Sequence, residues 1–347
     1  MFLRRRQFGV LAAATVAMPW VARAQSANLA TLYEAAKKEG ELTWYTVPQT
    51  SEVAERMGRT FTTRYPGVKV NVVRTTAQVA FQRLNQDLKA GAENCDVFTS
   101  TDLAHYVDLK ARKLLLKHQP EAVSRQDKRV QNLDPDGHFH ASSAFMMGLI
   151  YNTSKMPAAA APTSWNDLLD PKWNAAAVVA HPAYSGAAGA WCIEMRKLYG
   201  DGWIKKLAAN KVHVGRSTID AVTSVISGEA SVSAGPMSLA ARSAGKGNPV
   251  ATLAPKEGPV LILAPSGILT NARHPNAAKL FLEWYLGSED TERISIEEFS
   301  VPLRAGAKAA PGVLGLGDAK PLLAPTPAEM VAEIPKVIDL WKDAFGV

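Results

Sequence analysis

The chain has 347 residues, more than a single compact core usually holds, so we expect two globular lobes. Apolar residues make up 47% of the sequence and charged residues 20%, which is typical of a folded globular protein and excludes a fibrous or unstructured chain. Beyond the N-terminus, no stretch approaches the roughly 18 uncharged apolar residues that a membrane-spanning helix needs.

Residues 1–24 have the pattern of an export signal. Three arginines at 4–6 precede an apolar run at 9–19, and ARA at 22–24 supplies the small residues that signal peptidase prefers. The paired arginines followed by Phe8 favour the twin-arginine type, with an uncleaved anchor as the alternative. Cleavage near Ala24 lowers the count of Lys and Arg from 39 to 35 against 32 acidic residues, so the net charge falls from +7 to about +3. No basic cluster remains that would suggest nucleic-acid binding.

Helix and strand patterns alternate along the first third of the mature chain. An amphipathic helix ends at Gly40. Strands are then expected at 41–47, 68–74 and 96–99, each followed by a helix, at about 53–61, 77–90 and 103–113. Strands that alternate with helices of this length predict βαβ units and a parallel sheet.

Two long apolar strands interrupt this alternation, and we interpret them as crossings between the lobes. They are AFMMGLIY at 144–151 and PVLILA at 259–264. Between them the alternation restarts, with strands expected at 176–180, 211–214 and 230–234. The predicted division is a first lobe of residues 28–143 plus 263–347, a second lobe of residues 152–258, and hinge crossings at 144–151 and 259–262.

The C-terminal segment is predicted to form a helix that packs in the core of the first lobe. Thr326 and Glu329 form a capping box around Pro327, and an apolar stripe follows. We expect Pro335 to divide this helix in two, because proline removes a helical hydrogen bond.

Ligands in open α/β sheets bind beyond the carboxyl ends of the strands, and the loops at these ends are rich in hydroxyls and glycine. The helix N-termini there favour an anion. The candidate ligand-binding residues are Gln49, Thr50, Arg74, Thr75, Thr76, Ser100 and Thr101 in the first lobe, and Tyr184, Ser185, Gly186, Arg216, Ser217 and Thr218 in the second.

Arg74 and Arg216 would offer a fork of donors from each lobe, suited to a carboxylate or phosphate. The alternative for each arginine is a solvated surface charge, and for each Ser or Thr a helix cap. For Asp102 we expect a role as a helix cap and not as a ligand-binding group.

The sequence contains no HExxH, Cys-x-x-Cys, GxSxG or glycine-rich nucleotide-binding motif. We therefore expect no catalysis, no cofactor and no metal site. The alternative is a two-lobed α/β enzyme, for which Asp102 would be the best general base. Cys95 and Cys192 are expected in different lobes as buried free thiols, although an exported compartment permits a disulfide.

The chain resembles the extracellular solute-binding proteins of ABC importers, nearest to the ferric-ion-binding-protein-like branch. The resemblance rests on the order and spacing of LYEAAKKEGELTWYT (32–46), YPGVKVNVVR (65–74), DVFTSTD (96–102), GLIYNTSKMP (148–157), TSWNDLLDPKW (163–173) and VLILAPSGILTNARHPNAAKLFLEWYLGSE (260–289). It implies a type II periplasmic-binding fold, with two α/β lobes that each have a mixed, mostly parallel sheet, joined by two hinge strands. It also implies closure on ligand and docking on an ABC permease of the inner membrane, and it adds Thr46 and Met237 to the ligand-facing loops.

That branch contains iron binders as well as binders of organic or phosphorylated anions. Its iron members supply adjacent tyrosines from the second lobe, whereas SAGPMSLAARS (233–243) has none and Tyr184 stands alone. We expect a small organic anion, namely a carboxylate, phosphonate or phosphorylated compound, with ferric iron as the alternative. We further expect a periplasmic monomer, and a sensor role in place of transport stays open.

Overall fold

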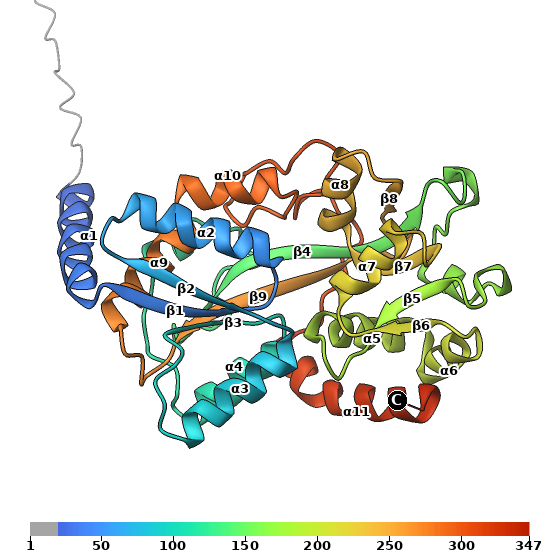
Figure 1. The fold of residues 1–347 in the computed structure, drawn as a ribbon, viewed down its shortest axis with the longest axis horizontal. Helices are drawn as coiled ribbons and strands as arrows, with labels where there is room; N and C mark the ends of the chain where they lie inside the picture. The colour runs from blue at the N-terminus through green and yellow to red at the C-terminus, as the bar shows by residue number, and fades with distance from the viewer. Residues whose placement is uncertain (1–19, 347) are drawn as a thin grey trace, which may run out of the picture.

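One curled sheet of nine strands runs through the whole molecule, flanked by helices (Figure 1). The computed structural model describes residues 20–346, and the side chains of the first helix from residue 28 onward. The strands are β1 Glu41–Thr46, β2 Lys69–Arg74, β3 Val97–Thr99, β4 Phe139–Asn152, β5 Ala177–Ala180, β6 His213–Gly215, β7 Val232–Pro236, β8 Val250–Leu253 and β9 Val260–Ile268. Their order is β2–β1–β3–β9–β4–β7–β5–β6, with β8 paired to β4.

The helices lie where the sequence pattern alternates, with two short additions. They are α1 Trp20–Glu39, α2 Ser51–Arg64, α3 Ala77–Lys89, α4 Leu103–Ala111, α5 Gly186–Tyr199, α6 Asp201–Ala209, α7 Thr218–Ile226, α8 Met237–Gly245, α9 Pro275–Gly287, α10 Glu289–Glu297 and α11 Pro327–Phe345. The additions that the sequence analysis missed are α6, which follows α5 after a single glycine, and α10, which follows α9 after a single serine.

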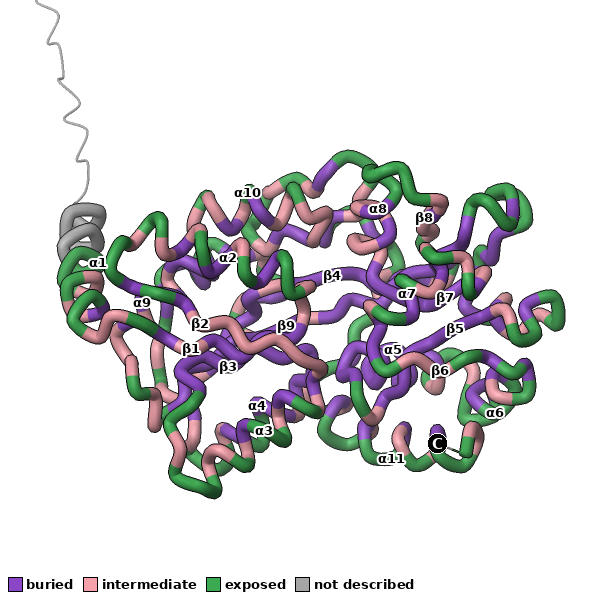
Figure 2. The backbone as a smooth tube through the Cα atoms, viewed as in Figure 1, coloured by how far each residue is buried: buried purple, intermediate pink, exposed green. Residues whose placement is uncertain are grey.

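The first lobe has the predicted βαβ architecture. β1 pairs in parallel with both β2 and β3. Helix α2 turns Val53, Met57 and Phe61 to one side, because residues three or four apart share a helix face. These side chains pack with Trp44 of β1 and Trp284 of α9 in one core. Figure 2 shows the same division, with buried strands inside and exposed outer helix faces.

Strands β4 and β9 carry the chain between the lobes and pair with each other antiparallel. β9 also pairs with β3 of the first lobe, and β4 with β7 of the second. Almost every residue of β4 is buried, which explains its unbroken apolar run. The crossing strand is longer than the predicted 144–151, since it begins at Phe139. The mixed two-lobed α/β fold expected from the sequence is confirmed.

The second lobe repeats the parallel arrangement, with β5 between β6 and β7. Its core gathers Trp165, Trp191 and Trp203. Trp191 lies at ring-centroid distances of 5.9 Å from Trp165 and 5.7 Å from Trp203, both edge-to-face, a favourable geometry for aromatic pairs.

The tail differs from its sequence assignment to the first lobe. Helix α11 packs on α5 and α6 of the second lobe and on α4 of the first (Figure 1). Ile334, Val337 and Trp341 join the core of the second lobe. The helix is continuous through Pro335, so the predicted division there is wrong. Burial of this apolar face stabilises the helix on both sides of the proline, which removes only one hydrogen bond.

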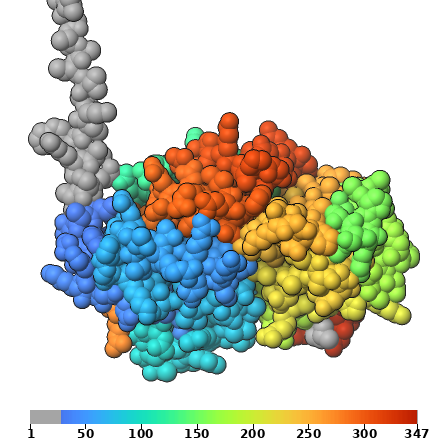
Figure 3. Space-filling view, turned by 45° about the horizontal axis from the view of Figure 1, so that its top comes forward, coloured from blue at the N-terminus to red at the C-terminus, as the bar shows by residue number. Residues whose placement is uncertain are grey.

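The two lobes are in contact at more than one place outside the crossing strands. In the space-filling view, first-lobe residues in blue meet second-lobe residues in yellow along one face (Figure 3). Arg242 of α8 forms an ion pair with Glu298, the C-cap residue of α10. On another side of the contact, the backbone of Gly186 at the start of α5 lies against Asp102 in front of α4.

Cys95 and Cys192 are buried, unpaired and in different lobes, as predicted. The predicted export signal falls mainly on residues 1–19, which lie outside the described part of the chain. Within the described part, none of the helices combines the length and apolar character that crossing a membrane requires.

Candidate functional site

The candidate site is a partly open cavity between the lobes. Both lobes and the crossing strand β4 contribute to its wall. The lining residues are Val47, Pro48, Arg74, Thr76, Ala77, Thr101, Phe145, Ser185, Ala187, Ser217, Thr218, Ile219 and Pro236. Its position beyond the carboxyl ends of parallel strands is the one that ligands take in open α/β sheets.

Three helix N-termini meet at this cavity. Thr76, Ser185 and Ser217 are the N-cap residues of α3, α5 and α7, and all three line it. The hydroxyls of Ser185 and Ser217 cap their own helices, accepting from the backbone N–H groups of Ala188 and Asp220. Thr76 makes no such side-chain cap bond. Because the first N–H groups of a helix lack intrahelical partners, three such ends produce a positive potential that favours an anion.

Arg74 is the only charged residue among the described residues that line the cavity. Its Nε donates to the carbonyl oxygen of Gln49 at 3.0 Å, which fixes the side chain at the end of β2. Within the described chain, no carboxylate lies at ion-pair distance from it. Burial lowers the pKa of the Arg74 guanidinium, and the more distant Asp220 opposes this shift. Arginine nevertheless stays charged, and a partly buried cation without a partner is stabilised by a bound anion.

An apolar wall completes the cavity, and the sequence analysis missed it. Val47, Phe145, Ile219 and Pro236 line the cavity together with the polar groups. Phe145 belongs to β4, so its place in the apolar crossing run was the available signal. Such a wall excludes water and strengthens electrostatic contacts inside the cavity.

The structure brings together six of the residues predicted to bind ligand. Those that line the interlobe cavity are Arg74, Thr76, Thr101, Ser185, Ser217 and Thr218. Gln49 and Thr50 line a neighbouring cavity that shares Pro48, Phe145, Ile219 and Pro236 with the first.

Four other candidates lie beside or behind the cavity. The Thr46 hydroxyl bonds Gln49, and the backbone N–H of Thr75 donates to the Thr46 carbonyl. Ser100 is buried and bonds Nδ1 of His105 at 3.0 Å. Gly186 acts through its backbone, which packs on Asp102.

Three candidates lie outside the cavity wall. Tyr184 is 46% exposed and its ring packs near that of His181. Arg216 is exposed. Met237 faces Gly148 of β4 and lines a separate small cavity. Sequence position alone could not separate these residues from the lining ones, since a loop presents its successive side chains in different directions.

The described residues of the cavity wall include no Tyr, His, Asp, Glu or Cys, the residue types that could bind ferric iron. Among the described residues, one group has metal-ligand geometry, namely Asp134, Asp136 and His138 in the first lobe. Nζ of Lys110 contacts both carboxylates. An ammonium thus stands where a cation would bind, and the group is explained as an ion-pair cluster.

Asp102, the best candidate for a general base, caps α4 and accepts from Gln78 at 2.8 Å. With Ser100 and His105 it forms a buried polar cluster, and none of the three lines the cavity. This arrangement supports a positioning role for the loop and offers no base to a bound molecule.

Comparison with known proteins agrees with this geometry. A family model described as bacterial extracellular solute-binding protein matches residues 44–292. An uncharacterised protein of Haemophilus influenzae (strain Rd) is 29% identical over 185 residues, 51% of this chain and 52% of that protein. The matched region therefore spans about half the length of this curated relative.

Several solved structures share the fold. The periplasmic binding protein AfuA from Actinobacillus pleuropneumoniae has a TM-score of 0.78 and 23% identity, over 89% of this chain and 99% of that one. Iron-bound HitA from Pseudomonas aeruginosa has a TM-score of 0.74 and 20% identity, over 88% and 99%. An ABC-transporter substrate-binding protein from Agrobacterium tumefaciens has a TM-score of 0.76 and 17% identity, over 88% and 94%. With the family model matching well over half of its length, the chain belongs to the bacterial extracellular solute-binding proteins, which bind solutes and are not enzymes.

Proposed function

We propose that this protein captures a small organic anion in the interlobe cavity and delivers it to an ABC permease. The observation that carries the proposal is the convergence of three helix N-termini on Arg74, a partly buried cation without a carboxylate partner in the described chain. A carboxylate, phosphonate or phosphate ester would pair with the guanidinium and accept from the hydroxyls and backbone N–H groups around it.

Binding couples to closure because the cavity wall comes from both lobes. Arg74, Thr76 and Thr101 belong to the first lobe, whereas Ser185 and Ser217 belong to the second. An anion can contact all of them only when the lobes are together, so it binds the closed form more tightly than the open one. This differential affinity shifts the population toward closure, the form that a permease would distinguish.

Proteins of similar structure bind ligands of different kinds. AfuA was solved with fructose-6-phosphate, and HitA with iron. The absence of Tyr, His, Asp, Glu and Cys from the described cavity wall argues against iron here and favours a molecule of the first kind. From the sequence we also propose that residues 1–24 are a twin-arginine export signal cleaved near Ala24, and that the mature protein is a periplasmic monomer.

The test is a thermal-shift screen of the mature, ligand-stripped protein with carboxylates, phosphonates, sugar phosphates, amino acids, polyamines and ferric citrate. A ligand that binds only the folded state raises the unfolding midpoint. We expect one anionic class to do so, and Arg74→Ala to weaken its binding by about tenfold or more. Arg216→Ala is the matched control, because this exposed arginine lies outside the cavity wall, and it should retain affinity. A shift with ferric citrate alone, or equal affinity in both variants, would refute the anion proposal.

A further inference from the structure

Tyr285 was not among the residues expected to act on a ligand, yet its hydroxyl contacts the loop that holds Arg74. It lies on α9 and is 3% exposed. The described residues that line the interlobe cavity do not include it, and it lines a different cavity inside the first lobe, together with Gln49 and Gln126. An effect of Tyr285 on a bound anion must therefore pass through a neighbouring residue.

Gln49 is that neighbour, because it contacts both Tyr285 and Arg74. Its side-chain Oε1 accepts from the Thr46 hydroxyl at 2.9 Å, and its Nε2 donates to the Tyr285 hydroxyl at 2.7 Å. The backbone carbonyl of the same residue accepts from Nε of Arg74 at 3.0 Å. A side chain that is fixed at its amide restricts the backbone that carries it, so the two side-chain bonds determine where this carbonyl points.

The Gln49 carbonyl decides which nitrogens of Arg74 can meet an anion. A guanidinium carries five N–H donors in a planar fork, and the bond to the carbonyl uses the one on Nε. The two terminal nitrogens are left for an anion, and parallel hydrogen bonds from such a pair are the strong geometry for a carboxylate or phosphate. A guanidinium that rotates freely must be ordered on binding, which lowers affinity.

The Tyr285 hydroxyl is itself held by β4, one of the crossing strands. Ser142 and Ser143 of this strand are within hydrogen-bonding reach of it. The Ser142 hydroxyl donates to the Ala264 carbonyl at 2.8 Å and accepts from Ser266 of β9 at 2.7 Å. Burial raises the pKa of Tyr285, so its hydroxyl stays protonated and can accept one hydrogen bond while it donates another. The anchor of the loop thus belongs to the buried centre of the protein.

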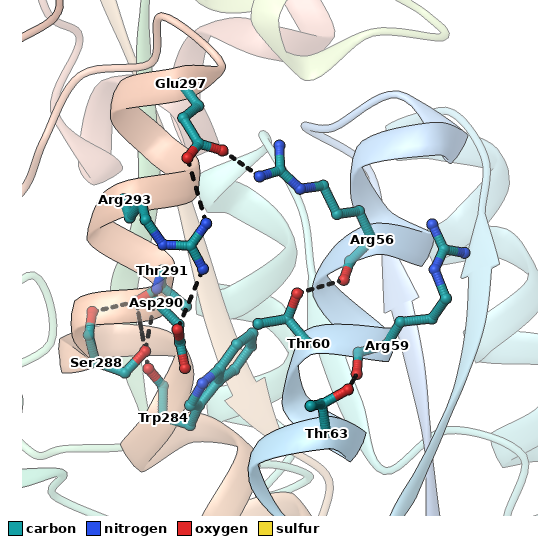
Figure 4. Close-up of polar contacts among 10 residues, drawn as sticks. All are labelled: Arg56, Arg59, Thr60, Thr63, Trp284, Ser288, Asp290, Thr291, Arg293 and Glu297. Carbon is teal, nitrogen blue, oxygen red and sulfur yellow. Dashed lines mark hydrogen bonds and ion pairs between the residues drawn. The ribbon is translucent and has the colours of Figure 1, made fainter.

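Helix α2 follows the loop directly and is held without Tyr285. Figure 4 shows Arg56 of α2 directed at Glu297 of α10, and the same arginine pairs with Glu298 at 3.2 Å. Loss of the Tyr285 hydroxyl should therefore release the Gln49 side chain and leave the helix in place.

We infer that Tyr285 is a positioning residue for anion binding: through Gln49 it orients the guanidinium of Arg74 in the interlobe cavity. The inference rests on the proposed function and extends the binding site to a residue that the ligand does not touch. If Tyr285 served only to fill the core, its hydroxyl would affect stability and leave Arg74 unchanged.

The first test needs no ligand and follows the Nε–H of Arg74 by heteronuclear NMR on the mature protein, with Arg74→Ala to assign the signal. In Tyr285→Phe this N–H should exchange with water about fivefold faster or more, because its acceptor is less well fixed. Phenylalanine keeps the ring contact with Trp44, whose centroid lies 5.3 Å away. Tyr45→Phe is the matched control, since it removes another buried tyrosine hydroxyl of the first lobe, bonded to Asp87 at 2.9 Å, and it should leave the exchange unchanged.

The second test measures binding of inorganic phosphate, methylphosphonate, glycerol 3-phosphate and malate by calorimetry. Tyr285→Phe should weaken the binding of each anion that depends on Arg74 by about fivefold. In the Arg74→Ala background it should have no further effect, since the group that it orients is gone. Gln49→Leu removes both side-chain bonds of the loop and should weaken binding at least as much.

The two tests separate failure of the inference from failure of the proposed function. Unchanged exchange or unchanged affinity in Tyr285→Phe, or an equal loss of affinity with and without Arg74, would overturn the inference and leave the proposed function standing. If Arg74→Ala binds these anions as the wild type does, or none of them binds, the proposed function fails and the inference with it.

Discussion

A β-carbon placed on Gly186 would lie 2.7 Å from the β-carbon of Asp102 and 2.8 Å from its backbone nitrogen. The two residues belong to different lobes, since Gly186 begins α5 and Asp102 caps α4. Glycine is therefore needed where the backbone of the second lobe approaches the first. The same contact brings the N-terminus of α5 next to Thr101 and the interlobe cavity.

Gly186→Ala should hinder closure without unfolding either lobe. The added methyl group meets backbone atoms, which cannot move aside as a flexible side chain would. We expect affinity for the ligand found in the screen to fall by about tenfold or more, because the closed form becomes less populated. Small-angle scattering should show a larger radius of gyration with saturating ligand. Gly202→Ala is the control, since nothing lies within 4 Å of its added carbon. A Gly186→Ala protein that closes like the wild type would contradict the assignment.

The ion pair between Arg242 and Glu298 should act as an interlobe clasp. Both side chains are 16% exposed, so the pair is only partly screened by water. Arg242→Ala should shift the open–closed equilibrium by about 1 kcal/mol, roughly a fivefold change, while Glu298 keeps Arg56 as a partner. Energy transfer between dyes on the two lobes would measure this. Arg293→Ala removes two surface ion pairs within α10 alone and should have no effect on the equilibrium; equal effects of the two variants would exclude the clasp.

Two buried histidines should make the fold less stable in mild acid. Burial lowers the pKa of His105, partly opposed by Asp102 and Asp108, and burial also lowers that of His140. Both folded-state values lie below the value of about 6.5 in the unfolded chain, so the unfolded state binds more protons as the pH falls below 6.5. The free energy of unfolding should therefore decrease from pH 7 toward pH 5.

Urea unfolding at pH 7.5, 6.5 and 5.5 measures this dependence. His105→Gln should give a shallower decrease than the wild type, with the remainder due to His140. His213→Gln provides a control at an exposed position and should retain the wild-type dependence. Identical slopes in the wild type and in His105→Gln would show that His105 does not contribute.

The two cysteines should be inert in the folded protein. Burial raises the pKa of both thiols, which suppresses the reactive thiolate as well as blocking access to it. Under native conditions Ellman's reagent should modify less than about one thiol per protein molecule in tens of minutes. In denaturant it should modify both thiols at once. Rapid reaction of one thiol in the native state would indicate that its lobe opens locally.

Local sequence patterns were sufficient to predict the main helices and strands of this protein. The capping residues Thr76, Ser185 and Ser217 were identifiable because a helix start has a short-range signature, and all three line the cavity. The crossing strands were identifiable because a strand covered on both faces reads as an apolar run. The order of these elements implied two lobes and a binding site between them.

Only the tertiary structure decided which residues meet. Arg74 is the last residue of β2 and Arg216 directly follows β6, yet Arg74 lines the cavity and Arg216 does not, because the direction of a side chain depends on the packing around it. The tail joined the second lobe because its apolar face fits α5 and α6. Gln126 and Tyr285 are far apart in sequence, and only folding places them in one cavity. Short-range patterns determine elements, whereas a cavity is a product of long-range packing that no local pattern records.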